Sequence, residues 1–276
     1  MNALTIDLED WRQLVHRKMT GEEIAPVQDV VDETHAILSL LEARATKATF
    51  FVLANIAETY PDLVRSIADS GHEVASHGWS HQLLPALGPD TFRSETRRAR
   101  SLLEAVTGRQ VVGYRAAEFS ATSWSAGILA EEGFAYDSSR CPTGRASDES
   151  ARPRTVRIGD RSLVEFPVLT HAALGRRWGL GGGGSLHVAP ASFVSRAVER
   201  AGERGVPAVV YLHPYDVTTR RLRTVAPART SREAVVRVRH SLPHNIGRRH
   251  AMRTLERLLE RFSFGPLISM LSTVEE

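Results

Sequence analysis

Apolar residues are distributed along the chain in two alternating patterns. Short runs rich in β-branched and aromatic residues predict buried strands, and apolar positions three or four residues apart predict the helices between them. The predicted strands are Ala3–Asp7, Ala48–Leu53, Glu73–Ala75, Val111–Gly113, Ala135–Asp137, Leu163–Val168 and Ala208–Leu212. The predicted helices are Val27–Leu41, Pro61–Ser70, Pro89–Val106, Ser123–Glu132 and Pro190–Arg204. This order predicts an α/β fold whose parallel sheet closes, fully or partly, into a barrel.

The pattern changes after the last of these strands. Thr218–Arg232 is rich in arginine and is predicted to be a loop, Arg248–Phe262 has the period of an amphipathic helix, and Phe264–Met270 is predicted to be a final strand. Neither an internal repeat nor a linker divides the 276 residues. We therefore expect one domain over residues 1–276, on which residues 217–276 pack as a C-terminal extension.

Composition narrows the class of protein. A hydrophobic fraction of 42% supports a buried core, and no apolar run approaches the roughly 20 residues that a membrane-spanning helix needs. The single cysteine, Cys141, excludes an intramolecular disulfide and a cysteine-rich zinc module. The first predicted strand begins almost at Met1, without the regions that make up a signal peptide, so a cytoplasmic location is expected.

The charge balance is dominated by arginine. Among the 35 basic residues only Lys18 and Lys47 are lysines, and the formal net charge is +3 with a pI near 9.3. A compositional bias explains this better than nucleic-acid binding does, because no basic stripe is interleaved with aromatic residues. No nucleic-acid partner is expected.

Three carboxylates stand close together at the end of the first predicted strand: Asp7, Glu9 and Asp10. Alternation along a strand places Asp7 and Glu9 on the same face, with Asp10 at the start of the next loop. Crowded carboxylates repel one another unless a cation or an arginine offsets their charge. The alternative is a solvated acidic loop, or Asp10 as the N-cap of a helix.

Two histidines, His77 and His81, follow the third predicted strand. If they lie on one helical turn, both imidazoles project from the same side. Imidazole nitrogens with a carboxylate oxygen suit a divalent ion such as zinc, and three protein ligands leave one position open for water. Two surface histidines are the alternative, but the acidic end of the first strand favours a metal site. His72 is expected to be structural.

Two more polar residues stand at predicted strand ends. Arg115 follows the fourth strand, where a guanidinium group can clamp a carboxylate through two hydrogen bonds. His213 follows the buried strand Ala208–Leu212, and an imidazole at that position can donate a proton to a leaving group. The alternatives are a surface arginine and a buried histidine without a chemical role.

Other reaction classes lack their motifs. No Gly-x-Ser-x-Gly sequence supports a serine hydrolase, and Gly181–Gly184 has no Walker lysine, so it indicates a flexible or close-packed substrate loop. Together with Arg145–Asp160 it is expected to form inserted loops or a hairpin. Cys141 has no obvious base beside it.

Taken together, these motifs resemble the polysaccharide deacetylases, the NodB-homology enzymes of carbohydrate esterase family 4. The similarity is greatest to the exopolysaccharide-associated subgroup, whose C-terminal extension resembles the segment from Arg239 to Phe264. The motifs that carry the resemblance are Thr5-Ile-Asp-Leu-Glu-Asp-Trp11, Ala48-Thr-Phe-Phe-Val52, His77-Gly-Trp-Ser-His81, Gly113-Tyr-Arg-Ala116, Tyr136-Asp-Ser-Ser139, Glu165-Phe-Pro-Val168 and Leu212-His-Pro214.

The resemblance implies a distorted (β/α)7-type barrel with a C-terminal helical extension. It also implies a metal-dependent hydrolase that removes N-acetyl groups from an amino sugar, an oligosaccharide or a polysaccharide precursor, with a metal-activated water as the nucleophile. In that mechanism Asp7 is the general base, Arg115 positions Asp7, and His213 is the general acid.

The resemblance further implies that His77 and His81 bind the metal with one carboxylate from the first motif. Strand alternation favours Glu9 for that ligand, whereas side-chain length favours Asp10. The expected ion is zinc, with cobalt, nickel or iron as alternatives. The oligomeric state is not indicated.

The chain departs from the family pattern at three positions. Ala117 stands where a proline is usual, Glu118 where a small or polar residue is usual, and His187 where relatives often have an arginine. Two other functions therefore stay open. One is hydrolysis of an amide or cyclic imide of a small substrate on the same barrel, and the other is sugar binding with little catalysis.

Overall fold

The computed structural model describes residues 1–218 and 220–274. Residue 219, in the predicted loop Thr218–Arg232, and residues 275–276 lie outside the described ones.

The strands of the structure are β1 (Asn2–Leu8), β2 (Thr49–Val52), β3 (Glu73–Ser76), β4 (Gly113–Tyr114), β5 (Tyr136–Asp137), β6 (Arg154–Ile158), β7 (Arg161–Glu165), β8 (Thr170–Ala173), β9 (Arg176–Gly179), β10 (Val209–Leu212) and β11 (Phe264–Gly265). The order across the main sheet is β10-β1-β2-β3-β4-β5-β7-β6, and β11 also pairs with β1.

This main sheet is parallel except at β6, which forms an antiparallel hairpin with β7. The segment after β7 joins the two edges of the parallel part. The backbone N–H of Val168 donates to the carbonyl oxygen of Arg140 over 2.9 Å, and that of Leu169 donates to the carbonyl oxygen of Val209, in β10, over 2.8 Å. The sheet is therefore closed into a distorted barrel, as the sequence predicted.

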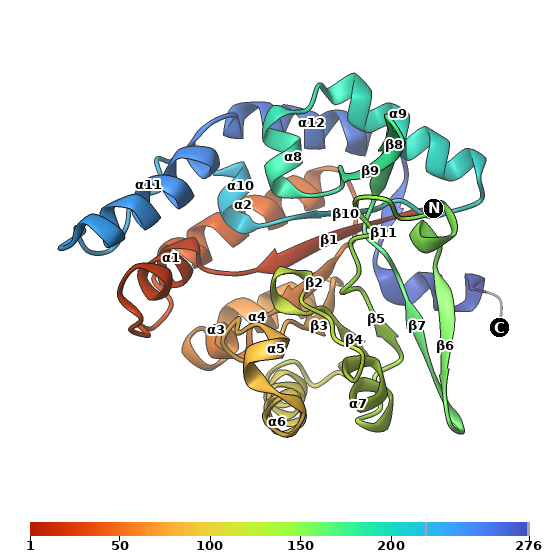
Figure 1. Cartoon of the computed structure of the whole chain (residues 1–276), viewed down its shortest axis with the longest axis horizontal. Coiled ribbons are helices and arrows are strands. Elements are labelled where there is room, and N and C mark those ends of the chain that lie inside the picture. Colours follow the sequence, from red (N-terminus) through yellow and green to blue (C-terminus); the bar gives the residue numbers. More distant parts are fainter. Residues whose placement is uncertain (219, 275–276) are drawn as a thin grey trace.

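Helices cover the outside of this barrel. They are α1 (Trp11–Thr20), α2 (Asp29–Ala43), α3 (Ala54–Thr59), α4 (Pro61–Asp69), α5 (Leu84–Leu87), α6 (Pro89–Thr107), α7 (Ser125–Glu131), α8 (Gly183–Val188), α9 (Ala191–Glu203), α10 (Pro214–Val217), α11 (Ser231–Asn245) and α12 (Arg248–Arg261). In Figure 1, α3 to α7 lie below the strands and α8, α9 and α12 lie above them. Helix α11 projects at the left, beyond α1.

Alternation along β1 separates an outer core from the barrel interior. Leu4, Ile6 and Leu8 belong to the large apolar cluster between the sheet and the helices, whereas Ala3 belongs to a second cluster inside the barrel. Because side chains on a strand alternate, Asp7 points to the same side as Ala3. The interior cluster also contains Phe51, Ala75, Tyr136, Leu267 and Met270.

The C-terminal segment contributes directly to the barrel. Strand β11 pairs with β1, and the 3₁₀ helix η3 (Leu267–Thr273) places Leu267 and Met270 in the interior cluster. The predicted strand Phe264–Met270 is therefore wrong beyond Gly265, because Pro266 cannot donate to a ladder and the chain turns after it. No helix in the described ranges is both long and apolar enough to cross a bilayer.

Two other predicted segments have different local structures. Arg145–Asp160 contains the first strand of the β6–β7 hairpin, so a hairpin is present there as expected. Gly181–Gly184 leads into helix α8 and packs closely: a Cβ on Gly182 would lie 2.0 Å from the Tyr211 ring, and one on Gly183 would lie 1.9 Å from Asp216 Oδ2. These glycines are needed for close approach rather than for flexibility.

Candidate active site

Four of the predicted site residues, Asp7, Glu9, His81 and His213, line a pocket at the carboxyl-terminal ends of the strands. His77 and Arg115 do not line it but contact Glu9 and Asp7, and Asp10 is not part of its lining. In Figure 1 the strands run from the N-terminus toward the left, so this end faces α1, α10 and α11. The pocket has a volume of about 370 Å³. Its lining includes Asp7, Glu9, Trp11, Lys18, His81, Glu118, Tyr211, His213, Tyr215, His240 and His244.

Glu9 lies between the two predicted histidine ligands. Its Oε1 is 3.0 Å from Nε2 of His77 and 2.9 Å from Nε2 of His81, and all three side chains are buried. Burial alone would raise the pKa of Glu9, but the neighbouring His81, His213 and His77 outweigh it and hold the pKa well below its usual value. The three donor atoms face one point, as the ligands of a single ion do.

Hydrogen bonding shows how His77 is oriented. Its Nδ1 is 2.8 Å from the carbonyl oxygen of Arg115, and a carbonyl only accepts, so Nδ1 carries the hydrogen. In the neutral ring Nε2 then presents a lone pair to Glu9 Oε1, and two acceptors at 3.0 Å repel each other unless a proton or a cation lies between them. The buried Nδ1 of His81 has no partner among the described residues. This donor set fits a divalent cation.

The loop that carries the histidines is not helical, which corrects the expected helical turn. The described chain from His77 to His81 has no helix, and Gly78 (φ +83°) and His81 (φ +58°) both have left-handed backbone conformations. Arg17 holds this loop, since its guanidinium donates to the carbonyl oxygens of Ser80 and His81. The two imidazoles consequently meet with ring centroids 5.3 Å apart.

Asp10 does not join the ligand cluster. Its Oδ1 accepts from the backbone N–H of Arg12 over 2.8 Å, which makes it the N-cap of α1, and its Oδ2 accepts from the N–H of Val27 over 2.6 Å. Burial raises the pKa of Asp10, although these backbone hydrogen bonds oppose the shift. The sequence left Glu9 and Asp10 as alternative ligands, and only Glu9 lies beside His77 and His81.

Asp7 and Arg115 form a buried ion pair inside the barrel. Arg115 is completely buried, and its NH1 donates to Asp7 Oδ1 over 2.7 Å and to Thr5 Oγ1 over 2.8 Å. Ser138 supports the same guanidinium, because its carbonyl and hydroxyl oxygens accept from Nε and NH2. Arg115 therefore fixes the position of the Asp7 carboxylate.

Replacing Arg115 with methionine should destabilise the protein by about 3–5 kcal/mol, because it leaves the buried Asp7 carboxylate without its partner. Chemical denaturation of the purified variant measures this loss. Arg65→Met is the matched control, since Arg65 makes an exposed ion pair with Asp62 on α4 and little change is expected. A loss for Arg115→Met as small as that of the control would contradict the structural role given to Arg115.

His213 is oriented by an acidic partner. Its Nδ1 is 2.8 Å from Asp216 Oδ2, which also accepts from the His213 backbone N–H. The other oxygen, Oδ1, is 3.1 Å from Nε2 of His187. Burial would lower the pKa of His213, but the carboxylates of Glu9 and Asp216 outweigh it and raise the pKa to about 9. His213 is thus protonated at neutral pH, with Nε2 3.9 Å from Glu9 Oε2.

Several lining residues were missed by the sequence analysis. Asp216 and Tyr215 follow His213 directly, and Tyr215 stacks on the His213 ring at 4.7 Å and donates to Glu9 Oε2 over 3.2 Å. The spacing of three residues between His213 and Asp216, typical of a residue capping a short helix, could have indicated this pairing. Trp11 has a buried, unpartnered Nε1–H and also lines the pocket.

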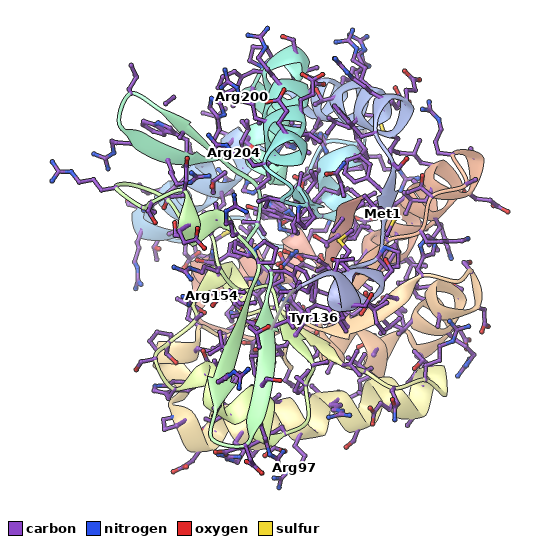
Figure 2. The ribbon with its side chains drawn as sticks, turned by 90° about the vertical axis from the view of Figure 1, so that its right-hand side faces the viewer. Met1, Arg97, Tyr136, Arg154, Arg200 and Arg204 are labelled. Atoms are coloured by element: carbon purple, nitrogen blue, oxygen red, sulfur yellow. The ribbon has the colours of Figure 1, made fainter. Side chains whose placement is uncertain are left out.

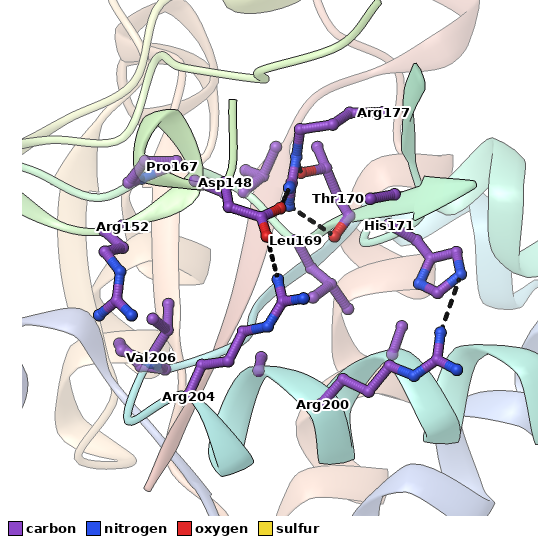
Figure 3. Close-up of a pocket in the computed structure, with 16 residues that line it drawn as sticks. Asp148, Arg152, Pro167, Leu169, Thr170, His171, Arg177, Arg200, Arg204 and Val206 are labelled. Carbon is purple, nitrogen blue, oxygen red and sulfur yellow. Dashed lines mark hydrogen bonds and ion pairs between the residues drawn. The ribbon is translucent and has the colours of Figure 1, made fainter. Parts of the chain in front are cut away.

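A second cavity, strongly basic, lies at the other end of the barrel. Figure 2 looks at the side that holds Met1, and there Arg200 stands on α9 and Arg204 directly follows that helix. Figure 3 shows these two arginines with Arg177 and Asp148 around a cavity of about 200 Å³. Asp148 pairs with Arg177 and Arg204, and none of the predicted site residues lines this cavity.

Two family models match successive parts of the chain. Residues 25–136 match the family model "Polysaccharide deacetylase", and residues 138–272 match a domain of unknown function (DUF3473). His77, His81 and Arg115 lie in the first range and His213 in the second. Asp7, on β1, and Glu9, directly after that strand, precede both ranges.

Similar curated proteins include a peptidoglycan deacetylase-like protein, FGM2, of Gibberella zeae, which is 34% identical over 95 residues. A peptidoglycan-N-acetylglucosamine deacetylase of Bacillus cereus is 35% identical over 75 residues. These matches cover 34% and 27% of this chain, and 28% and 27% of the two relatives. The chain therefore spans less than a third of the length of either relative.

Solved structures share the fold over nearly the whole chain. A Mycobacterium smegmatis protein assigned to the polysaccharide deacetylases superimposes with a TM-score of 0.64 at 21% identity, over 99% of this chain and 90% of the other. The Puue allantoinase superimposes with a TM-score of 0.62 at 14% identity, over 98% and 88%. Proteins named for different activities thus share this barrel, and the site must decide the chemistry.

Proposed function

We propose that this chain, which belongs to the polysaccharide deacetylase family, is a metal-dependent hydrolase that removes N-acetyl groups from an amino sugar. The observation that carries the proposal is that Asp7, Glu9, His81 and His213 line one pocket while His77 lies against Glu9. Similar proteins that are named as deacetylases of peptidoglycan and of chitooligosaccharides support it.

Three residues are proposed to hold the ion. They are Glu9, His77 and His81, with Glu9 rather than Asp10 as the carboxylate ligand because Asp10 is engaged as a helix cap. Zinc is the expected ion, and cobalt, nickel and iron are alternatives. A divalent cation held there supplies Lewis-acid chemistry, which makes water more acidic and polarises the amide carbonyl.

The chain's own residues perform the proton transfers. Asp7, fixed by Arg115, accepts a proton from the attacking water as the new C–O bond forms. His213, protonated and held by Asp216, donates a proton to the amide nitrogen as the C–N bond breaks. The products are acetate and the free amine of the sugar, so water is consumed and the protons balance.

The test is acetate release by metal-depleted protein supplemented with one divalent ion at a time. Oligomers of N-acetylglucosamine are compared with small acetylated compounds and with a cyclic ureide such as allantoin. We expect acetate and free amine in equal amounts from the acetamido sugars, and only with metal present. Ring opening of the ureide without acetate release would instead establish the small-substrate alternative, which the allantoinase likeness keeps open.

Replacing Asp216 with asparagine should move the alkaline limb of the pH–rate profile to lower pH. The Asp216 carboxylate helps to raise the pKa of His213 to about 9, and His213 acts only when protonated, so loss of that charge makes activity fall at a lower pH. The measurement is kcat/KM against pH. A uniform decrease at every pH, with the limb unmoved, would give Asp216 only a structural role. Asp62→Asn, at an exposed carboxylate, is the control.

A further inference from the structure

Helix α11 presents an apolar stripe to solvent. Val235, Val238 and Leu242 are spaced by three and four residues, so they share one side of the helix. Each is more than half exposed, and α11 buries no residue. The stripe continues through Ile246 and across a groove to Val225, and these five side chains are five of the twelve large apolar residues exposed in the described part of the chain.

Arginines surround this stripe. The groove, about 630 Å³, lies between α11 and residues 221–227 and is lined by Arg221, Arg223 and Arg237 as well as by Val225, Val238 and Leu242. Residues 220–247 contain seven arginines and one acidic residue, Glu233, so this segment carries a formal charge of +6 in a chain whose net charge is +3. We call these apolar and basic residues together the α11 surface.

The opposite side of the helix faces the catalytic pocket. His240 and His244 line that pocket, and they are displaced by two residues from Val238 and Leu242. Two residues correspond to about 200° around an α-helix, so the histidines and the apolar stripe lie on opposite sides. In Figure 1 the helix projects from the end of the molecule that holds the strand carboxyl termini. The α11 surface therefore lies next to the entrance of the pocket.

We propose that the α11 surface binds an anionic lipid bilayer. Aliphatic side chains enter the boundary between headgroups and acyl chains, while the arginines contact lipid phosphates. Nucleic acid fits less well, because residues 220–247 contain no Phe, Tyr or Trp to stack on bases. A second copy of the chain fits less well too, since it would bring two segments of charge +6 together. The surface lies at the rim of the pocket, so bound protein would act on acetamido sugars held at the membrane.

The test measures binding of the full chain to vesicles by sedimentation. Equimolar phosphatidylglycerol and phosphatidylcholine should bind the protein, and phosphatidylcholine alone should bind it much more weakly. The double variant Val238→Ser with Leu242→Ser should lose about tenfold or more in affinity, because two aliphatic side chains no longer enter the bilayer. Arg221→Gln with Arg223→Gln should also lose about tenfold, and this loss should shrink as salt is raised.

Matched control variants distinguish binding through the α11 surface from the general effect of removing exposed aliphatic side chains. Leu174→Ser with Val188→Ser removes two exposed aliphatic residues elsewhere and should leave vesicle binding unchanged. Both apolar double variants should keep wild-type acetate release from soluble oligosaccharide and an unchanged circular dichroism spectrum. Binding does not require the proposed chemistry, so an inactive protein that still binds vesicles would fail only the proposed function.

Four results would overturn the membrane proposal. One is absence of binding to the anionic vesicles, and another is equal binding by the wild type and the α11 variants. The third is a concentration-dependent dimer, detected by light scattering and abolished by Val238→Ser with Leu242→Ser, which would assign the surface to self-association. Saturable binding of duplex DNA that exceeds vesicle binding would assign it to nucleic acid.

Discussion

Substitution of His213 by alanine is expected to lower kcat for deacetylation by about a hundred- to ten-thousandfold while the protein still binds its metal. An amide nitrogen leaves as an amine only if it is protonated, and His213 is the protonated group that Asp216 holds at the pocket. His81 also contacts a carboxylate, that of Glu9, but it is assigned to the metal, so His213 is the group placed to donate the proton. The loss should therefore be in turnover rather than in folding or metal content.

The experiment for His213 combines three measurements on the same protein. Metal content is determined by elemental analysis, acetate release by steady-state kinetics, and folding by thermal unfolding. His35→Ala, at an exposed histidine on α2, serves as the control and should be unchanged in all three. Wild-type turnover in His213→Ala would remove His213 from the mechanism, whereas loss of metal would mean that it acts as a ligand.

Substitution of Glu9 by glutamine is expected to weaken metal binding by at least about a hundredfold and to abolish metal-dependent acetate release. Removing a group that only orients a metal ligand already lowers metal affinity 10–100-fold. The loss should be larger for Glu9, because its Oε1 is the atom placed between the two imidazoles. Glutamine keeps the size of the side chain but loses its charge, so packing changes little. Metal affinity is measured by calorimetric titration of the metal-free protein.

Asp10→Asn is the matched control for Glu9→Gln. It also removes one carboxylate from the first motif, but Asp10 caps α1 and accepts from the N–H of Val27. We therefore expect a loss of about 1–2 kcal/mol in the free energy of unfolding, with metal affinity retained. The opposite outcome, metal lost in Asp10→Asn and kept in Glu9→Gln, would mean that Asp10 is the ligand.

The sequence predicted the regular part of the barrel well. Strands such as Ala3–Asp7 and Ala208–Leu212 are continuous apolar runs because a parallel strand is buried on both faces, and they were found within about one residue of their observed bounds. Helix α11 was missed, since its apolar stripe is short and stands among arginines, and Pro243 inside it is a residue that usually ends a helix. Its N-cap signature, Thr230 followed by Glu233, was a local signal that could have indicated it.

The residues of the candidate site at strand ends were predicted well, and those whose position depends on loop geometry were not. Asp7 lies near the end of β1, and Arg115 and His213 directly follow β4 and β10. Strands in a parallel barrel end at one rim, so the meeting of these residues follows from topology. The loop from His77 to His81 was predicted as a helical turn, because spacing alone does not reveal a left-handed backbone at His81. Asp216 was missed because its partnership with His213 depends on a short helix after the strand.

By itself, the sequence determined the alternation of strands and helices and the chemical types of residue at each strand end, because both depend on local patterns of two and 3.6 residues. Only the tertiary structure shows which of Glu9 and Asp10 faces the imidazoles. Both follow β1, which ends at Leu8, but Glu9 still points toward the histidines, whereas Asp10 is the N-cap of α1, which begins at Trp11. Which carboxylate faces the imidazoles depends on where the backbone changes direction, and that direction is set by contacts between distant parts of the chain.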